Sequence, residues 1–272
     1  MRRSLMLFLV VVLLLMVSSC FLVSKDGEVI RVLILDNGSY PAYYDGWNEN
    51  SFVNASTVLN KSYRLFIKVV TDAKLVSNPA ILDKFDVMVI PDNGPSVALV
   101  NSIVSWHNTG KGIVAVDGAA CFINHGIISP GSNGKNVWWK YDSDHGTKIR
   151  TTLSHYITEG YPVGWQKSIT TSVNDCAYYF LDKVNTLVGM NVLAVNPDDT
   201  SLVADFAYDR GGGKRIAFVG PYDNFGDAAL ERLIIQAVIW AAGYELPPEI
   251  LRVDPSATYE TYELAGNQLN TH

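Results

Sequence analysis

The sequence predicts an α/β fold, in which a mostly parallel sheet carries helices on both faces. Continuous apolar runs are typical of strands that are buried on both sides. Four such runs lie at residues 29–36, 64–70, 85–91 and 112–117. Helical patterns separate them, and strands that alternate with helices indicate a parallel sheet.

The helices are marked by their end signals. Pro79 stands in the first turn of one helix, and Pro95 opens a second, which Gly110 ends. A longer helix is expected from about Asp227, a candidate N-cap, to Ala242.

The second half of the chain begins irregularly. Residues 121–167 are rich in Gly, Ser, Asn and aromatic residues, and we expect them to form long loops on the rim of the sheet. Strands are expected again at residues 188–195, 201–208 and 215–220.

The N-terminus has the pattern of an export signal. A Met-Arg-Arg start precedes an apolar run from Leu5 to Val17, which is shorter than the roughly 20 residues of a membrane-spanning helix. Two serines and Cys20 follow, in a stretch that resembles a lipoprotein box. Residues 1–26 are therefore expected to be a leader that anchors the chain to the outer face of a membrane through lipid on Cys20. An uncleaved membrane anchor and clean secretion remain as alternatives.

The rest of the chain fits one domain at residues 27–246, followed by a polar tail at 247–272. The formal net charge is −6, which argues against nucleic-acid binding because that function needs a basic face. Asn37, Asn54 and Asn60 each begin an Asn-X-Ser triplet, so they are candidate glycosylation sites of an exported chain.

Three cysteines bear on the compartment. If Cys20 carries lipid, Cys121 and Cys176 are an even pair in an oxidising environment. We expect them to form a disulfide, with two buried thiols as the alternative.

Several segments resemble a known superfamily in their order and spacing. The strand at 32–39, the FDVMVIPDNG stretch at 85–94 and the KGIVAVDGAA stretch at 111–120 are the first three. Further matches lie at 153–160, 213–218 and 239–243. Together they resemble the class I glutamine amidotransferase-like superfamily and, within it, the ThuA-like (trehalose utilisation-like) branch. The resemblance implies a flavodoxin-like, three-layer fold, and it makes His155 the match of a family histidine that we interpret as structural.

The resemblance also locates the position of the amidotransferase nucleophile. That chemistry requires a cysteine on an elbow after the strand, with a histidine and a carboxylate to activate it. Asp117 occupies the matching position, and Cys121 lies four residues later. The segment after the last strand, residues 220–223, contains no histidine. Glutamine hydrolysis is therefore not expected.

Three expected strands end in an aspartate, namely Asp36, Asp92 and Asp117. In the expected 2-1-3-4 strand order, the carboxyl ends of strands 1, 3 and 4 are neighbours, at the edge where α/β sheets bind ligands. The three carboxylates are candidates to bind a ligand or a hard cation such as Ca²⁺, or to share a proton. Alternatively, each serves only as a turn former.

Aromatic residues suggest a second kind of contact. Trp138 and Trp139 are expected on the same rim, where aromatic faces beside Asp and Asn can stack on sugars. Alternatively, they cover the loops and pack against the sheet. The sequence thus predicts a non-catalytic cell-surface module that binds a glycan or a neighbouring envelope protein. The alternative is an extracellular carbohydrate-active enzyme that uses the strand-end aspartates.

Overall fold

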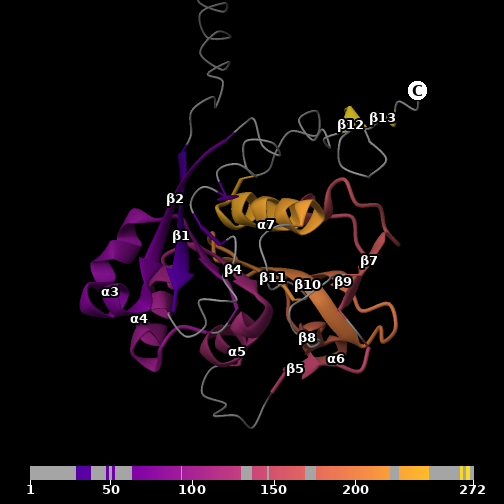
Figure 1. Cartoon of the computed structure of the whole chain (residues 1–272), viewed down its shortest axis with the longest axis horizontal. Coiled ribbons are helices and arrows are strands. Elements are labelled where there is room, and N and C mark those ends of the chain that lie inside the picture. The colour runs from indigo at the N-terminus through magenta and orange to yellow at the C-terminus, as the bar shows by residue number, and fades with distance from the viewer. Residues whose placement is uncertain are drawn as a thin grey trace, which may run out of the picture.

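The computed structural model describes most of the expected domain. The described residues are 29–37, 47–48, 51–52, 63–92, 94–129, 137–145, 147–168, 176–220 and 227–244, with the backbone of two short paired strands, β12 (Leu264–Ala265) and β13 (Gln268–Leu269). In this part of the chain, one large sheet separates two layers of helices (Figure 1). The predicted α/β, flavodoxin-like three-layer fold is confirmed.

Half of the large sheet is parallel. Its strands are β1 (Val29–Asp36), β2 (Arg64–Thr71), β3 (Val87–Ile90), β4 (Gly112–Val116) and β11 (Arg215–Val219). They lie in the order β2-β1-β3-β4-β11, and each neighbouring pair is parallel. Every residue of β3 and β4 is buried, which explains their unbroken apolar sequences. The expected 2-1-3-4 order is thus found.

The sheet continues with antiparallel strands. These are, in order from β11, β10 (Leu202–Asp209), β9 (Met190–Val195), β6 (Lys148–Thr151) and β7 (Gln166–Ser168). Two more strands branch from this path: β8 (Cys176–Phe180) pairs with β10, and β5 (Trp139–Asp142) pairs with β8. Long loops were expected between residues 121 and 167, but β5, β6 and β7 lie there. These strands have only three or four residues each, too few for an alternating pattern to be recognised.

Helices cover both faces. One face carries α3 (Asp72–Ser77), the 3₁₀ turn η2 (Pro79–Lys84), α4 (Val97–Asn108) and, after the short turn η3 (Asp117–Ala119), α5 (Ala120–Phe122) and the π-helical turn η4 (Ile123–Ile128). The other face carries the turn η5 (Tyr156–Thr158) and α7 (Ala228–Ala241). A further short helix, α6 (Leu181–Val184), follows β8.

The long helix α7 packs tightly on the middle of the sheet (Figure 1). Its N-cap Asp227 accepts hydrogen bonds from the amides of Ala229 and Leu230 at 3.0 and 3.4 Å. At its other end, a Cβ added to Gly112 of β4 would lie 2.3 Å from the Ala241 carbonyl oxygen. Gly112 therefore allows helix and strand to approach closely.

The expected disulfide is wrong, because Cys121 and Cys176 are both free thiols. Cys176 is buried in the hydrophobic cluster beneath α7. Cys121 is exposed on α5, whose flanking residues Ala120 and Phe122 pack on the opposite face of the sheet. The sheet thus separates the two side chains.

Some sequence predictions lie outside the described residues: the leader at 1–26 with Cys20, and the sequons at Asn54 and Asn60. Asn37 is described, and its Nδ2 atom, which would carry a glycan, donates to the Gly94 carbonyl at 3.4 Å. No helix among the described residues is long and apolar enough to cross a membrane.

Candidate functional site at the carboxyl edge of the sheet

Two of the predicted aspartates occupy sharp turns at the ends of their strands. Asp117 follows β4 with φ +42°, and Asp92 lies just beyond β3 with φ +37°. They are the non-glycine residues with positive φ in the described part of the chain. Aspartate tolerates this left-handed conformation better than most side chains. At Asp117 the chain passes from a strand through the turn into helices, the geometry of a nucleophile elbow.

The carboxylates of these two residues bind backbone amides. The Oδ1 atom of Asp92 accepts from the Gly118 amide at 3.2 Å. The Oδ1 atom of Asp117 accepts from the Ala177 amide at 2.7 Å. Both side chains are buried, so these bonds join the ends of β3, β4 and β8. The contacts match the turn-former interpretation more closely than that of a ligand site.

Asp36, the third predicted carboxylate, ends β1 and is half-buried. In the described residues, no group of three His, Cys, Asp or Glu side chains could hold a metal ion. The cation site at Asp36, Asp92 and Asp117 stays a prediction. In the structure, Asp92 and Asp117 direct carboxylate oxygens at the amides of two different elements.

A fourth carboxylate near this edge was not found from the sequence. Asp205 lies on β10, opposite Val219 of β11 and Ala194 of β9, where an irregularity interrupts the strand register. It is 1% exposed. Among the described residues neither of its oxygens has a hydrogen-bond partner.

The environment of Asp205 favours its neutral form. Burial raises the pKa of Asp205 to about 7, and the Gly220 backbone amide has a smaller, opposite effect. That amide donates its hydrogen bond to the Ala204 carbonyl at 2.8 Å, so it does not satisfy the carboxylate. The only sequence signal was an acidic residue inside an otherwise apolar strand.

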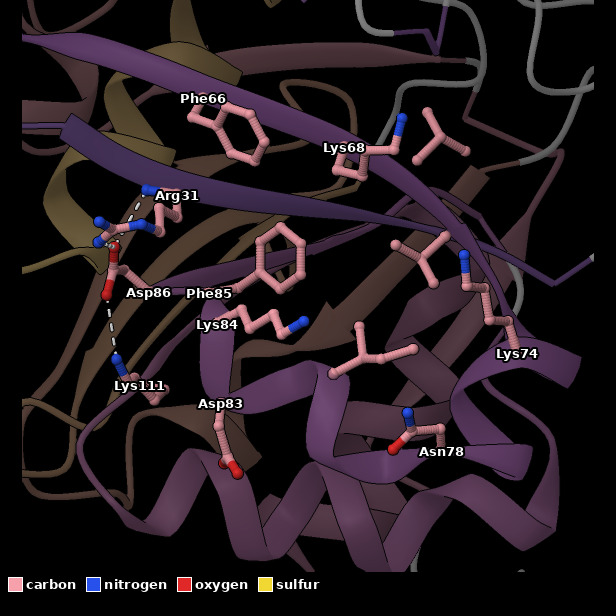
Figure 2. A pocket seen from close by; sticks show the side chains of 13 residues that line it. Arg31, Phe66, Lys68, Lys74, Asn78, Asp83, Lys84, Phe85, Asp86 and Lys111 are labelled. Carbon is pink, nitrogen blue, oxygen red and sulfur yellow. Dashed lines mark hydrogen bonds and ion pairs between the residues drawn. The ribbon is translucent and has the colours of Figure 1, made fainter.

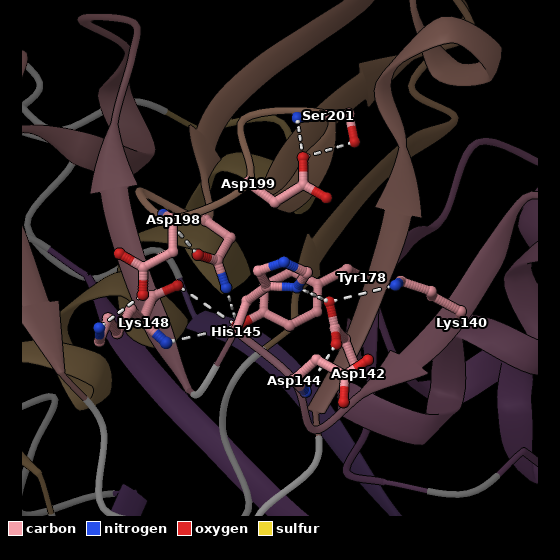
Figure 3. A network of polar contacts seen from close by, with 10 residues as sticks. Lys140, Asp142, Asp144, His145, Lys148, Tyr178, Asp198, Asp199 and Ser201 are labelled. Carbon is pink, nitrogen blue, oxygen red and sulfur yellow. Dashed lines mark hydrogen bonds and ion pairs between the residues drawn. The ribbon is translucent and has the colours of Figure 1, made fainter.

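A histidine–aspartate pair lies at the end of β5 (Figure 3). The Nδ1 atom of His145 is 2.8 Å from Oδ2 of the buried Asp142. Asp142 also accepts from the Asp144 amide at 2.9 Å and pairs with Lys140 at 3.2 Å. Burial tends to raise the pKa of Asp142, but the bonds from His145, the Asp144 amide and Lys140 lower it overall. The bond to Asp142 in turn raises the pKa of His145.

Strand β8 connects this pair to the elbow. Cys176 is the register partner of Asp142, and the next residue, Ala177, donates its amide to Asp117. One residue further, the Tyr178 hydroxyl accepts from Asn196 Nδ2 at 3.2 Å and donates to the Lys148 carbonyl at 3.3 Å. Strand β8 therefore contacts both the elbow and the polar network of Figure 3.

The predicted aromatic residues lie at the start of β5. Trp138 is half-buried against the cluster beneath α4 and α5. Trp139 lies edge-on to Tyr141, with ring centroids 5.2 Å apart at 80°, and Tyr141 is 45% exposed. Because side chains alternate along a strand, these two rings lie on one side of β5 and Lys140 and Asp142 on the other. The aromatic pair and the histidine–aspartate pair thus occupy different faces.

His155 caps a turn, as the structural interpretation expected. Its Nδ1 atom accepts from the Ile157 amide at 3.1 Å, and its own amide donates to Thr158 Oγ1 at 3.0 Å. The centroid of its ring lies 5.4 Å from the ring centroid of Trp240 on α7.

The strand order and the turn after β4 define a flavodoxin-like α/β fold, and the similar solved structures include ThuA-like proteins. One, from Bacteroides uniformis ATCC 8492, is 13% identical, with 78% of this chain and 91% of that chain covered and a TM-score of 0.50. Another, from Parabacteroides merdae ATCC 43184, is 14% identical, with 82% and 95% covered and a TM-score of 0.50. No protein-family model and no curated protein sequence matches the chain. At this identity the likeness shows the fold alone, which is ThuA-like.

Proposed function

We propose that this protein is a non-catalytic binding module with a ThuA-like fold, exported and held at the cell surface by its N-terminal leader. The main support for this proposal is the set of hydrogen bonds at the elbow. Asp117 replaces a nucleophile and is held by the Ala177 amide. The amide that follows it, on Gly118, already donates to Asp92. In elbow hydrolases the amide after the nucleophile stabilises the oxyanion, so both a nucleophile and a free donor are missing here.

The ligand class that we propose is a glycan of the cell envelope, with a neighbouring envelope protein as the other candidate. Support comes from the aromatic rings of Trp139 and Tyr141 on β5. Among the described strands, β5 forms hydrogen bonds with β8 alone. An exposed aromatic ring supplies a large apolar contact with a polar tip. Export rests on the sequence of residues 1–26.

The test is a panel of envelope oligosaccharides, assayed by thermal shift and then by calorimetry, with and without EDTA. We expect one class of sugar to stabilise the protein, and Tyr141→Ala to weaken that binding about tenfold. Phe66→Ala is the matched control, because Phe66 is an exposed aromatic residue on the distant strand β2. Absence of any stabilising sugar, or equal loss in both variants, would contradict the glycan assignment. Mass spectrometry of the native N-terminus tests lipid on Cys20.

One observation favours the second candidate, a carbohydrate-active enzyme. The Nδ1 atom of His145 lies 2.8 Å from the carboxylate of the buried Asp142, an arrangement that orients the imidazole for proton transfer. Hydrolysis of an oligosaccharide by the wild type that is lost in His145→Ala would establish this candidate. Glutamine should release no ammonia in either case.

A further inference from the structure

A basic groove lies at the edge of the sheet, between strand β2 and the helical segment of α3 and η2 (Figure 2). Its volume is about 870 Å³, within the range of about 300–1,000 Å³ that is typical of small-ligand sites. Arg31, Asp86 and Lys111, at one end of it, belong to the amino-terminal side of β1, β3 and β4. The lining of the groove shares no residue with the elbow or with the aromatic pair of the function proposed above.

The charge of the groove is opposite to that of the chain. Its lining includes five basic side chains and two acidic ones, whereas the whole chain has a net charge of −6. The basic residues are Arg31, Lys68, Lys74, Lys84 and Lys111, and the acidic ones are Asp83 and Asp86. A concave surface with one sign of charge raises the local concentration of ligands of the other sign.

The basic charge is not neutralised evenly along the groove. Asp86 accepts from Lys111 Nζ and from the Arg31 amide, both at 3.0 Å, so one end is internally paired. Lys68 and Lys74 lie at the end farther from Asp86, with Lys84 extending between (Figure 2). Within the described residues, Lys74 and Lys84 form no ion pair.

An exposed aromatic ring also lines the groove. Phe66 projects from β2 with 52% of its surface exposed, and Phe85 and Ile81 also line the groove. Isolated exposed apolar residues are ordinary on protein surfaces. A phenylalanine inside a basic groove, however, offers an apolar contact between two or three ammonium groups. Inorganic anions and uniformly polar polyanions would leave that contact unused.

We propose that this groove binds an acidic polypeptide segment, in which an aromatic or aliphatic side chain packs on Phe66 while flanking carboxylates pair with Lys74 and Lys84. Charge complementarity selects the acidic partner and speeds its encounter. The apolar contact on Phe66 favours a segment with an apolar side chain over an inorganic anion, and an acidic polysaccharide is one of the outcomes of the test.

The probe is a fluorescein-labelled twelve-residue peptide of alternating Glu and Leu with a central Phe, followed by fluorescence anisotropy at 50 and 300 mM salt. We expect binding that weakens at the higher salt, because the lysines are exposed and screened. Lys74→Glu combined with Lys84→Glu should lower the affinity at least tenfold. Lys183→Glu is the matched control, since Lys183 is an exposed lysine on α6, outside the groove, beside Asp182.

Phe66→Ala should lower the affinity three- to tenfold, whereas Val188→Ala, at an apolar residue that is 94% exposed elsewhere, should leave it unchanged. Tyr141→Ala should have no effect on the peptide, which separates this test from the glycan test. Each variant is first checked by circular dichroism melting.

Three results would overturn the proposal. The first is peptide binding that the double charge reversal does not change. The second is equal competition by polygalacturonate together with no effect of Phe66→Ala, which would assign the groove to acidic polysaccharide. The third is absence of peptide binding together with a dimer in light scattering that Lys84→Glu dissociates, which would assign it to a second copy of the chain.

Discussion

Replacing Asp205 by asparagine should change how the stability of the protein depends on pH. The pKa of Asp205 is raised from 3.8 to about 7 in the folded state. Between these two values the unfolded chain has released the proton and the folded chain retains it. Stability therefore falls as pH rises through this window, by about 1.4 kcal/mol per pH unit. The total is on the order of 4 kcal/mol by pH 7.

An asparagine side chain at this position carries no titrating proton, so the variant lacks this loss. We expect the unfolding free energy of Asp205→Asn, measured relative to wild type, to rise by on the order of 4 kcal/mol from pH 4 to pH 7 and to be level above pH 8. A buried amide without partners costs about 1–3 kcal/mol, but at every pH, so it does not alter the slope. Urea unfolding followed by far-UV circular dichroism at half-unit pH steps measures the difference.

Asp142→Asn is the control of opposite sign. The pKa of Asp142 is held below its ordinary value, so its contribution to stability is present above the unfolded pKa and is lost as pH falls. Relative to wild type, this variant should lose stability at neutral pH and recover it in acid. A difference curve for Asp205→Asn that stays flat from pH 4 to 8 would refute the reasoning, because it would mean that the buried carboxyl keeps an ordinary pKa.

Three further changes test the packing. Gly112→Ala should destabilise the protein by about 1–3 kcal/mol, because its Cβ would lie 2.3 Å from the Ala241 carbonyl; an unchanged denaturation midpoint would contradict that close approach. Asp227→Ala should cost about 1 kcal/mol through loss of the α7 N-cap, and a stability equal to wild type in urea would show that the cap contributes nothing. Because Cys121 and Cys176 are free thiols, dithiothreitol should leave the melting temperature unchanged, and a lower one would indicate a bridge.

The parallel half of the fold was predictable from the sequence because strands that are buried on both faces have continuous apolar sequences. Strands such as β3 and β4 are apolar at every position, and Pro95 and Asp227 marked the helices that follow. Short strands have no comparable pattern in their sequences. β8, with the sequence CAYYF, and the three- to four-residue strands β5, β6 and β7 are recognisable only by their partners.

The candidate site was predictable in position and not in chemistry. The elbow at Asp117 follows from the end of an apolar strand, and its left-handed backbone agrees with that position. No local pattern, however, reveals that its carboxylate binds Ala177, 60 residues away. The burial of Asp205 is not predictable from local sequence either, because it depends on the two strands that flank β10. The pair of His145 with Asp142 is likewise recognisable only once Asp142 is known to be buried.

The position of α7 has a consequence for how the chain folds as it is synthesised. Strands β1 to β4 are complete at Val116, but the long helix that covers one of their faces begins only at Ala228. At typical rates of about 5–20 residues per second, a ribosome needs on the order of 5–25 s to add the roughly 110 residues between them. During that interval this apolar sheet face lacks the long helix that covers it. We therefore expect a chaperone to hold the nascent chain unfolded until α7 emerges.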